Sequence, residues 1–269
     1  MTDREYFEVI LHELGLLLDQ IGLLCDVVLI GGQVLAVEQV AAGEDPLLQV
    51  ETDTGQRIDR GYSLDSDLLI DHPDPDESAR WDELPHVLRE AGYQRGPRGY
   101  QWERQVGDVY VRIDLFSPQH GPATATEMTP LPRGDSVLAR AQEVHLQVGA
   151  RVVKIKTPSL VDFLLMKLDA TRIRRPPNPK DAFDLYAYVR RKGAKIVGEA
   201  LLAARKRERD EALPRLFELF GSEGSQGVID VLAFAPTLIG DDRLLVVKDV
   251  VRVFREVRRV AEEVDRPQG

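Results

Sequence analysis

The spacing of hydrophobic residues changes along the chain between a period of three or four and a period of two, which predicts a mixture of helices and strands. In the first 156 residues it predicts helices at 3–21, 34–40 and 79–91, strands at 25–30, 47–50, 56–62, 62–71, 108–116, 143–148 and 152–156, short strands within 92–107 and a long loop at 117–135. The strand at 108–116 has the clearest alternation, because Val109, Val111 and Ile113 are separated by larger or polar side chains.

The second part of the chain has a helical pattern throughout, and it begins where the composition switches at Thr157 and Pro158. Threonine is a favourable N-cap and proline a favourable first helical residue, so the first helix is predicted to run from there to about Arg174. Further helices are predicted at 179–192, 195–208, 211–220, 226–235 and 242–264. We therefore predict two domains, a mixed one at residues 1–156 and an all-helical one at residues 157–269.

Composition restricts the class of protein. The 269 residues are 43% hydrophobic and 30% charged, as in an ordinary soluble globular protein. The single cysteine, Cys25, cannot form an internal disulfide, which fits a cytoplasmic protein. The sequence has no apolar run long enough for a membrane span, and its start lacks the basic residues of a signal peptide. The net charge of -10 disfavours binding nucleic acid through the whole surface, leaves a local basic groove open and suits a protein that holds metal cations.

Two aspartates lie near the start of the strand predicted at 62–71. A period of two places Asp65 and Asp67 on one face of that strand, with apolar side chains mainly on the other. Neighbouring carboxylates are costly unless a cation lies between them, and a divalent metal that carries a nucleotide phosphate is the commonest such cation. The alternative is a polar loop that leads into the strand, with both aspartates in solvent.

A third aspartate, Asp114, lies on the polar face of the strand predicted at 108–116, near its end. If this strand pairs beside the one that carries Asp65 and Asp67, the three carboxylates converge. The alternative is a surface acid that pairs with Arg112 or with another base.

Gly31 and Gly32 lie between a predicted strand and a predicted helix. Glycines let a phosphate approach the backbone, and the free N–H groups at a helix start favour an anion. The pair is neither a Walker loop, since no Gly-Lys-Ser/Thr follows, nor the GxGxxG fingerprint. A tight turn without function is the alternative.

The helical part contains a second group of charged residues, namely Lys167, Lys180, Asp181 and Asp184. A purely structural interpretation is open for part of this group. Asn178 as N-cap, Pro179 in the first turn and Asp181 three residues after the cap form a helix start without any further role. Lys180 and Asp184 are also spaced as an i,i+4 ion pair.

Together these features resemble the DNA polymerase β-like nucleotidyltransferase superfamily, and in particular its AbiEii-type branch, which includes toxins of type IV toxin–antitoxin systems. The stretches at 156–160, 165–168 and 178–185, with the last reading Asn-Pro-Lys-Asp-Ala-Phe-Asp-Leu, are similar to the lysine helix and the Lys-Asp-x-x-Asp motif of that branch. The resemblance covers residues 25–190. It implies an α+β fold, with a small mixed β-sheet flanked by helices and an all-helical C-terminal domain.

The resemblance also implies roles for the polar residues. Asp65 and Asp67 would hold two Mg²⁺ ions, and Asp114 would help to hold the ion that activates the attacking hydroxyl. The residues that would contact the nucleotide are Gly31, Gly32, Gln33, Lys167, Lys180, Asp181 and Asp184. Of these, the glycines and Gln33 would lie against the phosphates, the lysines would reach the triphosphate, and the last two aspartates would orient a lysine or the substrate.

Two departures from the superfamily pattern stand out. The gap from Gly32 to Asp65 is longer than usual, so the hairpin predicted within it is an insertion that the fold must accommodate. The residue after the glycine pair is Gln33, where relatives often have a small hydroxyl residue.

The predicted activity is Mg²⁺-dependent transfer of a nucleoside monophosphate from an NTP to a hydroxyl. For a toxin-like enzyme the acceptor would be the 3′ end of a tRNA, and an antitoxin protein would be a partner. Basic residues that would face the RNA, or would only be a solvated helix end, are Arg172, Arg174, Arg175, Lys180, Arg190, Arg191 and Lys192. The alternatives are a small acceptor such as an aminoglycoside, and a catalytically silent relative that binds a nucleotide or a partner protein.

Overall fold

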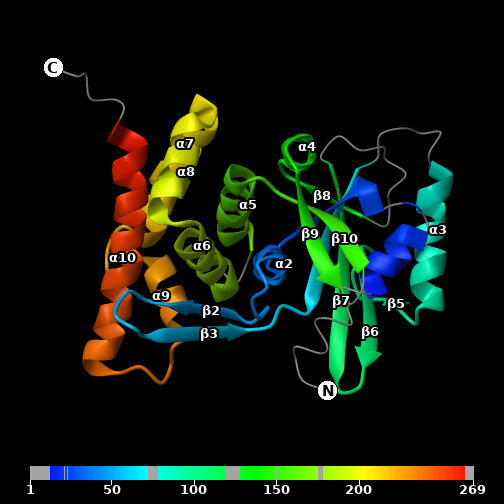
Figure 1. Cartoon of the computed structure of the whole chain (residues 1–269), viewed down its shortest axis with the longest axis horizontal. Coiled ribbons are helices and arrows are strands. Elements are labelled where there is room, and N and C mark those ends of the chain that lie inside the picture. Colours follow the sequence, from blue (N-terminus) through cyan, green and yellow to red (C-terminus); the bar gives the residue numbers. More distant parts are fainter. Residues whose placement is uncertain are drawn as a thin grey trace. The chain divides into compact units, whose positions relative to one another are not determined.

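The computed structural model describes residues 13–20, 22, 24–71, 78–118, 128–148, 151–174 and 178–263. The chain divides into two compact units, one of residues 1–47 and 62–159 and the other of residues 48–61 and 160–269 (Figure 1). We name the first the sheet unit and the second the helical unit. The chain passes from one unit to the other three times, because residues 48–61 leave the sheet unit and the chain then returns to it.

The described part of the sheet unit is built on an eight-stranded mixed sheet. Its strands are β1 (Val27–Ile30), β4 (Asp65–Ile70), β5 (Gln94–Arg95), β6 (Gln101–Val106), β7 (Val109–Pro118), β8 (Thr129–Leu131), β9 (Gln142–Val148) and β10 (Arg151–Thr157). Their order is β5-β6-β7-β4-β1-β10-β9, with β8 beside β7. Strand β4 is antiparallel to β1 and parallel to β7, and β1 is parallel to β10. The mixed sheet that the sequence predicted is confirmed.

Helical segments of the sheet unit are residues 13–20, η1 (Leu24–Asp26), α2 (Gln33–Ala41), α3 (Ser78–Glu90) and α4 (Gly134–Ala139). Helix α2 is almost entirely buried, with Val34, Leu35 and Val37 at most 2% exposed. The helix predicted at 3–21 is described only over its last part, residues 13–20.

The centre of the sheet is apolar on both faces. All four residues of β1 are buried, as are Leu68, Leu69 and Ile70 at the end of β4. A strand that is buried on both faces has no place for a charge. The carboxylates of β4 therefore occur only at its beginning, where Asp65 is exposed and Asp67 is partly exposed.

The helical unit contains α5 (Leu160–Ile173), α6 (Pro179–Lys192), α7 (Ala194–Ala203), α8 (Lys206–Phe220), α9 (Gln226–Leu232) and α10 (Gly240–Glu262). Helices α7 and α10 approach closely because Gly198 has no side chain: a Cβ there would lie 2.6 Å from Cβ of Val260. Phe220 and Phe254 stack with ring centroids 3.9 Å apart. The predicted α+β class with a helical C-terminal part is confirmed. In the described ranges, every helix is too short or too polar to cross a bilayer.

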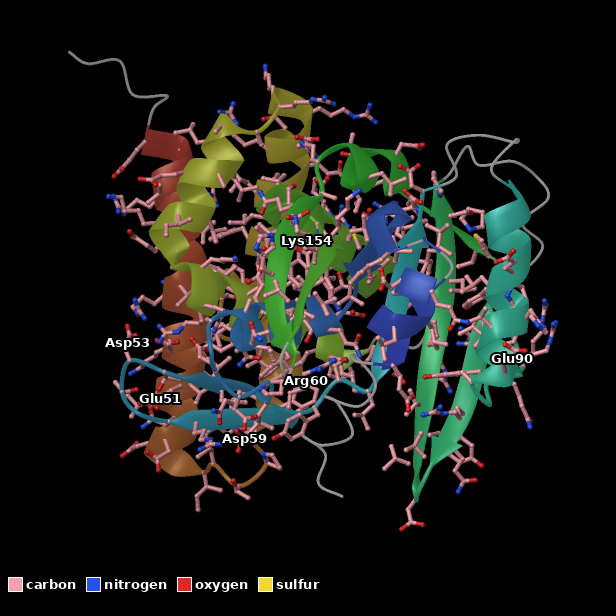
Figure 2. The ribbon with its side chains drawn as sticks, turned by 45° about the vertical axis from the view of Figure 1, so that its right-hand side comes forward. Glu51, Asp53, Asp59, Arg60, Glu90 and Lys154 are labelled. Carbon is pink, nitrogen blue, oxygen red and sulfur yellow. The ribbon has the colours of Figure 1, made fainter. Side chains whose placement is uncertain are left out.

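The hairpin predicted between Gly32 and Asp65 is confirmed as β2 (Leu48–Glu51) paired with β3 (Arg57–Gly61). The sequence placed it in the first domain, whereas the structure groups it with the helical unit. Figure 2 labels four charged residues of this hairpin, Glu51, Asp53, Asp59 and Arg60. Its apolar anchor is Ile58, which is fully buried. The chain therefore inserts a piece of the helical unit between α2 and β4.

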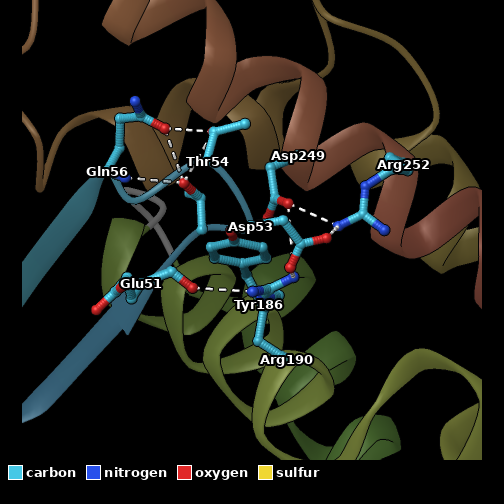
Figure 3. Close-up of polar contacts among 9 residues, drawn as sticks. Glu51, Asp53, Thr54, Gln56, Tyr186, Arg190, Asp249 and Arg252 are labelled. Carbon is cyan, nitrogen blue, oxygen red and sulfur yellow. Dashed lines mark hydrogen bonds and ion pairs between the residues drawn. The ribbon is translucent and has the colours of Figure 1, made fainter.

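Ion pairs hold the tip of the hairpin to the helices (Figure 3). Arg190 of α6 donates to Oδ1 of Asp53 at 2.7 Å and to the backbone carbonyl of Glu51 at 2.9 Å. Arg252 of α10 donates to the other oxygen of Asp53 and, at 2.7 Å, to Asp249. These contacts, together with the burial of Ile58, are the physical reason why the hairpin belongs to the helical unit.

Three local predictions were wrong. Thr157 caps no helix: it ends β10, paired with Gln142 and 1% exposed, and the helix begins at Leu160. Sheet pairing therefore outweighs the local cap signal. In the loop predicted at 117–135, residues 129–131 form strand β8 and residues 134–135 begin α4, whereas residues 119–127 lie outside the described residues. Helix α7 ends at Ala203 and α8 begins at Lys206, since the Glu208 side chain accepts from the backbone N–H of Arg205.

Candidate functional site

Strand β4 places the first two predicted carboxylates next to the third. In the parallel pair of β4 with β7, Asp67 is opposite Asp114 and Asp65 is opposite Arg112. Residues opposite each other in a sheet have their side chains on the same face, and so do residues two apart in one strand. Asp65, Asp67 and Asp114 therefore lie on one face of the sheet, as predicted from the alternation of the two strands.

The glycine pair lies directly beside this face. Ile30, the last residue of β1, is opposite Asp67, and Gly31 follows with φ +77°. A Cβ at Gly31 would lie 2.0 Å from Oδ2 of Asp67. The Asp67 carboxylate thus occupies the space that any other residue at position 31 would fill, and it lies against the turn that starts α2.

Helix α2 begins with Gly32 as its N-cap, a residue that has no side chain with which to cap the first N–H groups. The first N–H groups of a helix have no partner within it and attract an anion. The Gln33 side chain points instead into the core, where Nε2 donates to the carbonyl of Ser63 at 3.2 Å and Oε1 accepts from Ser66 at 2.9 Å. Only the backbone of Gln33 is therefore left for the predicted phosphate contact.

Asp114 has one oxygen bound and one without a partner. Gln101 of β6, which is opposite it in the ladder, donates from Nε2 to Oδ2 at 3.2 Å. Oδ1 is buried and has no hydrogen-bond partner among the residues that the structure describes. Burial raises the pKa of Asp114 above its ordinary value, against the opposing effects of the Gln101 hydrogen bond and of Arg112, while Asp65 adds to the rise.

Arg112 is the cation nearest in sequence to Asp114 on this face. Its Nε and Nη2 lie 2.9 and 2.8 Å from Oε1 of Glu103. Burial lowers the pKa of Arg112, but the hydrogen bond to Glu103 and the charges of Asp65 and Asp114 raise it above its ordinary value. The pairing of Asp114 with Arg112, which the sequence left open, is thus replaced by a pairing of Arg112 with Glu103.

The donor set of this face suits Mg²⁺ in its chemistry. All three candidate ligands are carboxylates, and the buried Oδ1 of Asp114 lacks a partner in the described structure. Within the described ranges, however, no three His, Cys, Asp or Glu side chains are gathered into a ready-made metal-binding group. Magnesium in nucleotide sites keeps several waters and takes one or two carboxylates plus the phosphates, so a preassembled cage of three is not required. The residues fit the ion, and the metal site stays a prediction.

The second predicted group lies in the helical unit. The Nζ of Lys167 on α5 lies 2.6 Å from Oδ2 of Asp184 and 3.2 Å from Oδ1 of Asp181, both on α6. Lys167 is 7% exposed and the aspartates at most 1%. Burial alone would lower the pKa of Lys167, but the charges of Asp184 and Asp181 raise it above its ordinary value. This lysine is a protonated member of a buried ion cluster, and its predicted contact with a triphosphate stays a prediction.

Two arginines complete this cluster. Arg60 of the inserted hairpin has its Nε 3.2 Å from Oδ1 of Asp184, and its side chain is 6% exposed. Arg174 has its Nη1 2.9 Å from Oδ2 of Asp181. Each carboxylate therefore lies between two cations. We name the set of Arg60, Lys167, Arg174, Asp181 and Asp184 the buried ion cluster; its one exposed member is Arg174, with 48% of its side chain exposed.

The start of α6 has the structural features that the sequence allowed. The Asn178 side chain accepts from the backbone N–H of Lys180 at 3.1 Å, so the predicted N-cap is confirmed. The Lys180 side chain is exposed. Asp184 is directed to Lys167 and Arg60, so these two cations take the place of the predicted i,i+4 partner.

A family model described as nucleotidyl transferase AbiEii toxin, type IV TA system, matches residues 62–247, which is more than two thirds of the chain. The chain belongs to the AbiEii nucleotidyltransferase toxin family. We name the face of the sheet that carries Asp65, Asp67 and Asp114 the sheet face. The AbiEii match includes these three carboxylates together with Lys167 and the Lys-Asp-x-x-Asp motif. Among curated proteins, no sequence matches this chain.

The AbiEii match begins directly after the inserted hairpin, so Gly31, Gly32 and Arg60 precede it. Sequence reasoning found the glycines from their place between a strand and a helix, but it missed Arg60 and Gln101. The only signal for Gln101 was its place within residues 92–107, where short strands were predicted, and its partner depends on the register of β6 with β7. The signal for Arg60 was absent, because its carboxylate partner lies in a different part of the chain.

Proposed function

We propose that this AbiEii-family protein transfers a nucleoside monophosphate from an NTP to a hydroxyl group, with Mg²⁺ as cofactor. The observation that carries the proposal is the sheet face, where Asp65, Asp67 and Asp114 lie in adjacent strands and Gly31 leaves room for the Asp67 carboxylate. The membership of a nucleotidyltransferase family supports the same reaction class.

The roles follow from the chemistry of each group. Asp65 and Asp67 would hold the cations, and Asp114 would offer its unpartnered oxygen to one of them. When bound, two divalent ions lower the pKa of an attacking hydroxyl and neutralise the departing pyrophosphate. The N–H groups at the start of α2 would bind a phosphate, since Gly31 and Gly32 let it approach the backbone.

The acceptor that fits a toxin of this family is RNA, and we propose the 3′ end of tRNA. Neutralisation of the toxin by an antitoxin protein is part of the same proposal, as the type IV toxin–antitoxin description of the family suggests. The alternative of a silent relative rested on the insertion before Asp65. That insertion forms a hairpin whose ion pairs with Asp184 and Arg190 lie within the helical unit, which supports a fold that accommodates it. The transfer assay described next tests the alternative.

The test is incubation with each labelled NTP, Mg²⁺ and either total tRNA or an aminoglycoside mixture. We expect label on tRNA, and a loss of at least about 100-fold in Asp67→Asn, because the cation clamp on the transferred phosphate is broken. The matched control is Asp108→Asn, an exposed aspartate in the turn between β6 and β7. Label on the aminoglycoside alone would contradict the RNA acceptor, and the absence of transfer to either acceptor would contradict the activity.

A further inference from the structure

Gln101 is the side chain that determines how Asp114 presents its carboxylate. It is 5% exposed, and its amide donates to Oδ2 of Asp114 at 3.2 Å. Oδ1 of the same carboxylate is left without a partner in the described residues. A buried carboxylate oxygen without a partner is costly, so one that persists in a fold calls for an explanation, and a bound cation or water is one that suits a carboxylate.

Two backbone hydrogen bonds hold the main chain of Gln101 in place, independently of its side chain. Its N–H donates to the carbonyl of Arg98 at 2.9 Å, and its carbonyl accepts from the N–H of Gly96 at 2.9 Å. Gly96 lies so close that a Cβ there would be 3.1 Å from Cβ of Gln101. The ladder with β7 then places the amide opposite Asp114. A donor held in this way restricts the carboxylate to one orientation.

The neutral charge of Gln101 matters as much as its position. A lysine or arginine here would form an ion pair with Asp114 and would compete with any cation for it. Two arginines act on the charge of Asp114, and each is bound elsewhere: Arg112 to Glu103 at 2.8 to 2.9 Å, and Arg98 to the hydroxyl of Tyr100 at 2.9 Å. The face thus provides Asp114 with a donor that fixes one oxygen and leaves its negative charge available.

We propose that Gln101 is a positioning residue that holds Oδ2 of Asp114 so that Oδ1 faces a divalent cation. This inference rests on the proposed function, because it assigns a supporting group to the same metal site. It adds a residue on β6 to a site that the sequence motifs place only on β4 and β7.

The experiment measures binding of Mn²⁺, as the probe ion, to the full chain without nucleotide, from the electron paramagnetic resonance signal of the free ion. Gln101→Leu and Gln101→Met both remove the donor, and the second keeps the length of the side chain. We expect both to weaken Mn²⁺ binding about 10- to 100-fold, the usual effect of removing a group that orients a metal ligand. The control is Gln105→Leu, the same residue type on the same face of β6, whose amide donates to the carbonyl of Gly107.

Three outcomes separate this inference from the proposed function. Weak binding in both Gln101 variants, with Gln105→Leu like the wild type and circular dichroism unchanged, supports it. If Asp67→Asn abolishes Mn²⁺ binding while both Gln101 variants bind like the wild type, the positioning role is overturned and the metal site stands. If the wild-type chain itself binds no Mn²⁺ and transfers no nucleotide, both fall together. The Mg²⁺ concentration for half-maximal transfer should rise in the Gln101 variants by the same factor as the Mn²⁺ dissociation constant.

Discussion

Asp114 in the sheet unit and Asp184 in the helical unit are aspartates whose oxygens have different partners. Asp184 is fully buried and lies between two cations: Lys167 binds Oδ2 at 2.6 Å, and Arg60 lies 3.2 Å from Oδ1 as an ion pair without the geometry of a hydrogen bond. Asp114 is partly buried and accepts one hydrogen bond from a neutral amide, with its other oxygen unpartnered among the described residues. Both carboxylates lie within residues 62–247, which the family model matches, but Asp184 alone has ion pairs with cations of its own unit among the described residues.

The difference indicates that the two carboxylates have different roles, one in stabilising the fold and one in binding a ligand. A buried charge that is paired on both sides is held in place by the fold, and removing its partners harms the fold first. A carboxylate that keeps an unpartnered oxygen costs stability and is retained where a ligand supplies the missing partner. We therefore expect mutations of the sheet face to lower nucleotide transfer, and mutations of the buried ion cluster to lower the free energy of unfolding.

The largest effect on stability is expected when each of these two aspartates is replaced by asparagine in a separate variant. Asp184→Asn leaves Lys167 and Arg60 buried with one carboxylate fewer, which should lower the free energy of unfolding of the helical unit by about 3–5 kcal/mol. Asp114→Asn should leave the stability of the sheet unit equal or higher. Denaturant unfolding in EDTA, followed by hydrogen exchange in peptides from α5 and α6 and from β6 and β7, assigns each change to its unit.

The expected direction of the stability change in Asp114→Asn follows from the raised pKa of Asp114. The folded state binds the proton more tightly than the unfolded state, so stability falls as pH rises through the window between the unfolded and the folded pKa. Above that window the ionised carboxylate disfavours folding when no metal is bound, and Asn removes this cost. Equal destabilisation by both substitutions would contradict the division between the units.

The next effect tests the contact of Gly31 with Asp67. Gly31→Ala places a Cβ where Oδ2 of Asp67 now lies, 2.0 Å away, so the carboxylate must move. A displacement of this size should lower nucleotide transfer about 100-fold. Gly43→Ala is the matched control, because Gly43 has φ +76°, close to the +77° of Gly31, and no atom of the described residues lies within 4 Å of its Cβ position.

Both alanines carry the strain of a left-handed backbone, about 1–2 kcal/mol, so stability alone does not separate them. Transfer activity does, when it is measured at a temperature where circular dichroism shows both variants folded. An equal loss of activity in the two variants would show that strain, rather than the position of the Asp67 carboxylate, limits the reaction.

Much of the sheet face could be predicted because its signals are local. The alternation in β4 and β7 determines which side chains share a face, and a glycine pair after a buried strand marks the start of α2. The partners of these residues could not be predicted in the same way. Gln101 meets Asp114 only through the register of β6 with β7, and one residue of slippage would direct Trp102 to that face instead.

The helical unit shows the same limit over a longer distance. The Lys-Asp-x-x-Asp motif was visible in the sequence, but its partner Arg60 comes from an insertion assigned by sequence order to the other domain. Thr157 failed for the opposite reason, because a good local cap signal lost to strand pairing with Gln142. Tertiary contacts decided both cases, and one sequence carries no direct record of them.

A smaller loss of stability is expected when arginines of the inserted hairpin are replaced, and two of them can be compared. Arg60→Met removes a buried partner of Asp184, which still keeps Lys167, so we expect a loss of about 1–3 kcal/mol in the stability of the helical unit. Arg57→Met breaks an ion pair with Asp59 in which both side chains are more than half exposed, and it should cost under about 1 kcal/mol. Denaturant unfolding of both variants measures the difference, and equal values would show that the hairpin is not bound through the buried ion cluster.

The smallest effect separates the helix cap from the charges that follow it. Asn178 caps α6 through the N–H of Lys180, so Asn178→Ala should lower stability by about 1 kcal/mol, and Asn178→Ser, another good cap, by much less. Neither change alters the charge of the buried ion cluster or touches the sheet face, so nucleotide transfer by the folded protein should be unchanged. A loss of transfer in Asn178→Ala that Asn178→Ser does not restore would mean that the amide of Asn178 itself contacts a substrate. In that case the start of α6 would belong with the sheet face, whose mutations affect chemistry, and the division between the two units would have to be drawn within the Lys-Asp-x-x-Asp motif.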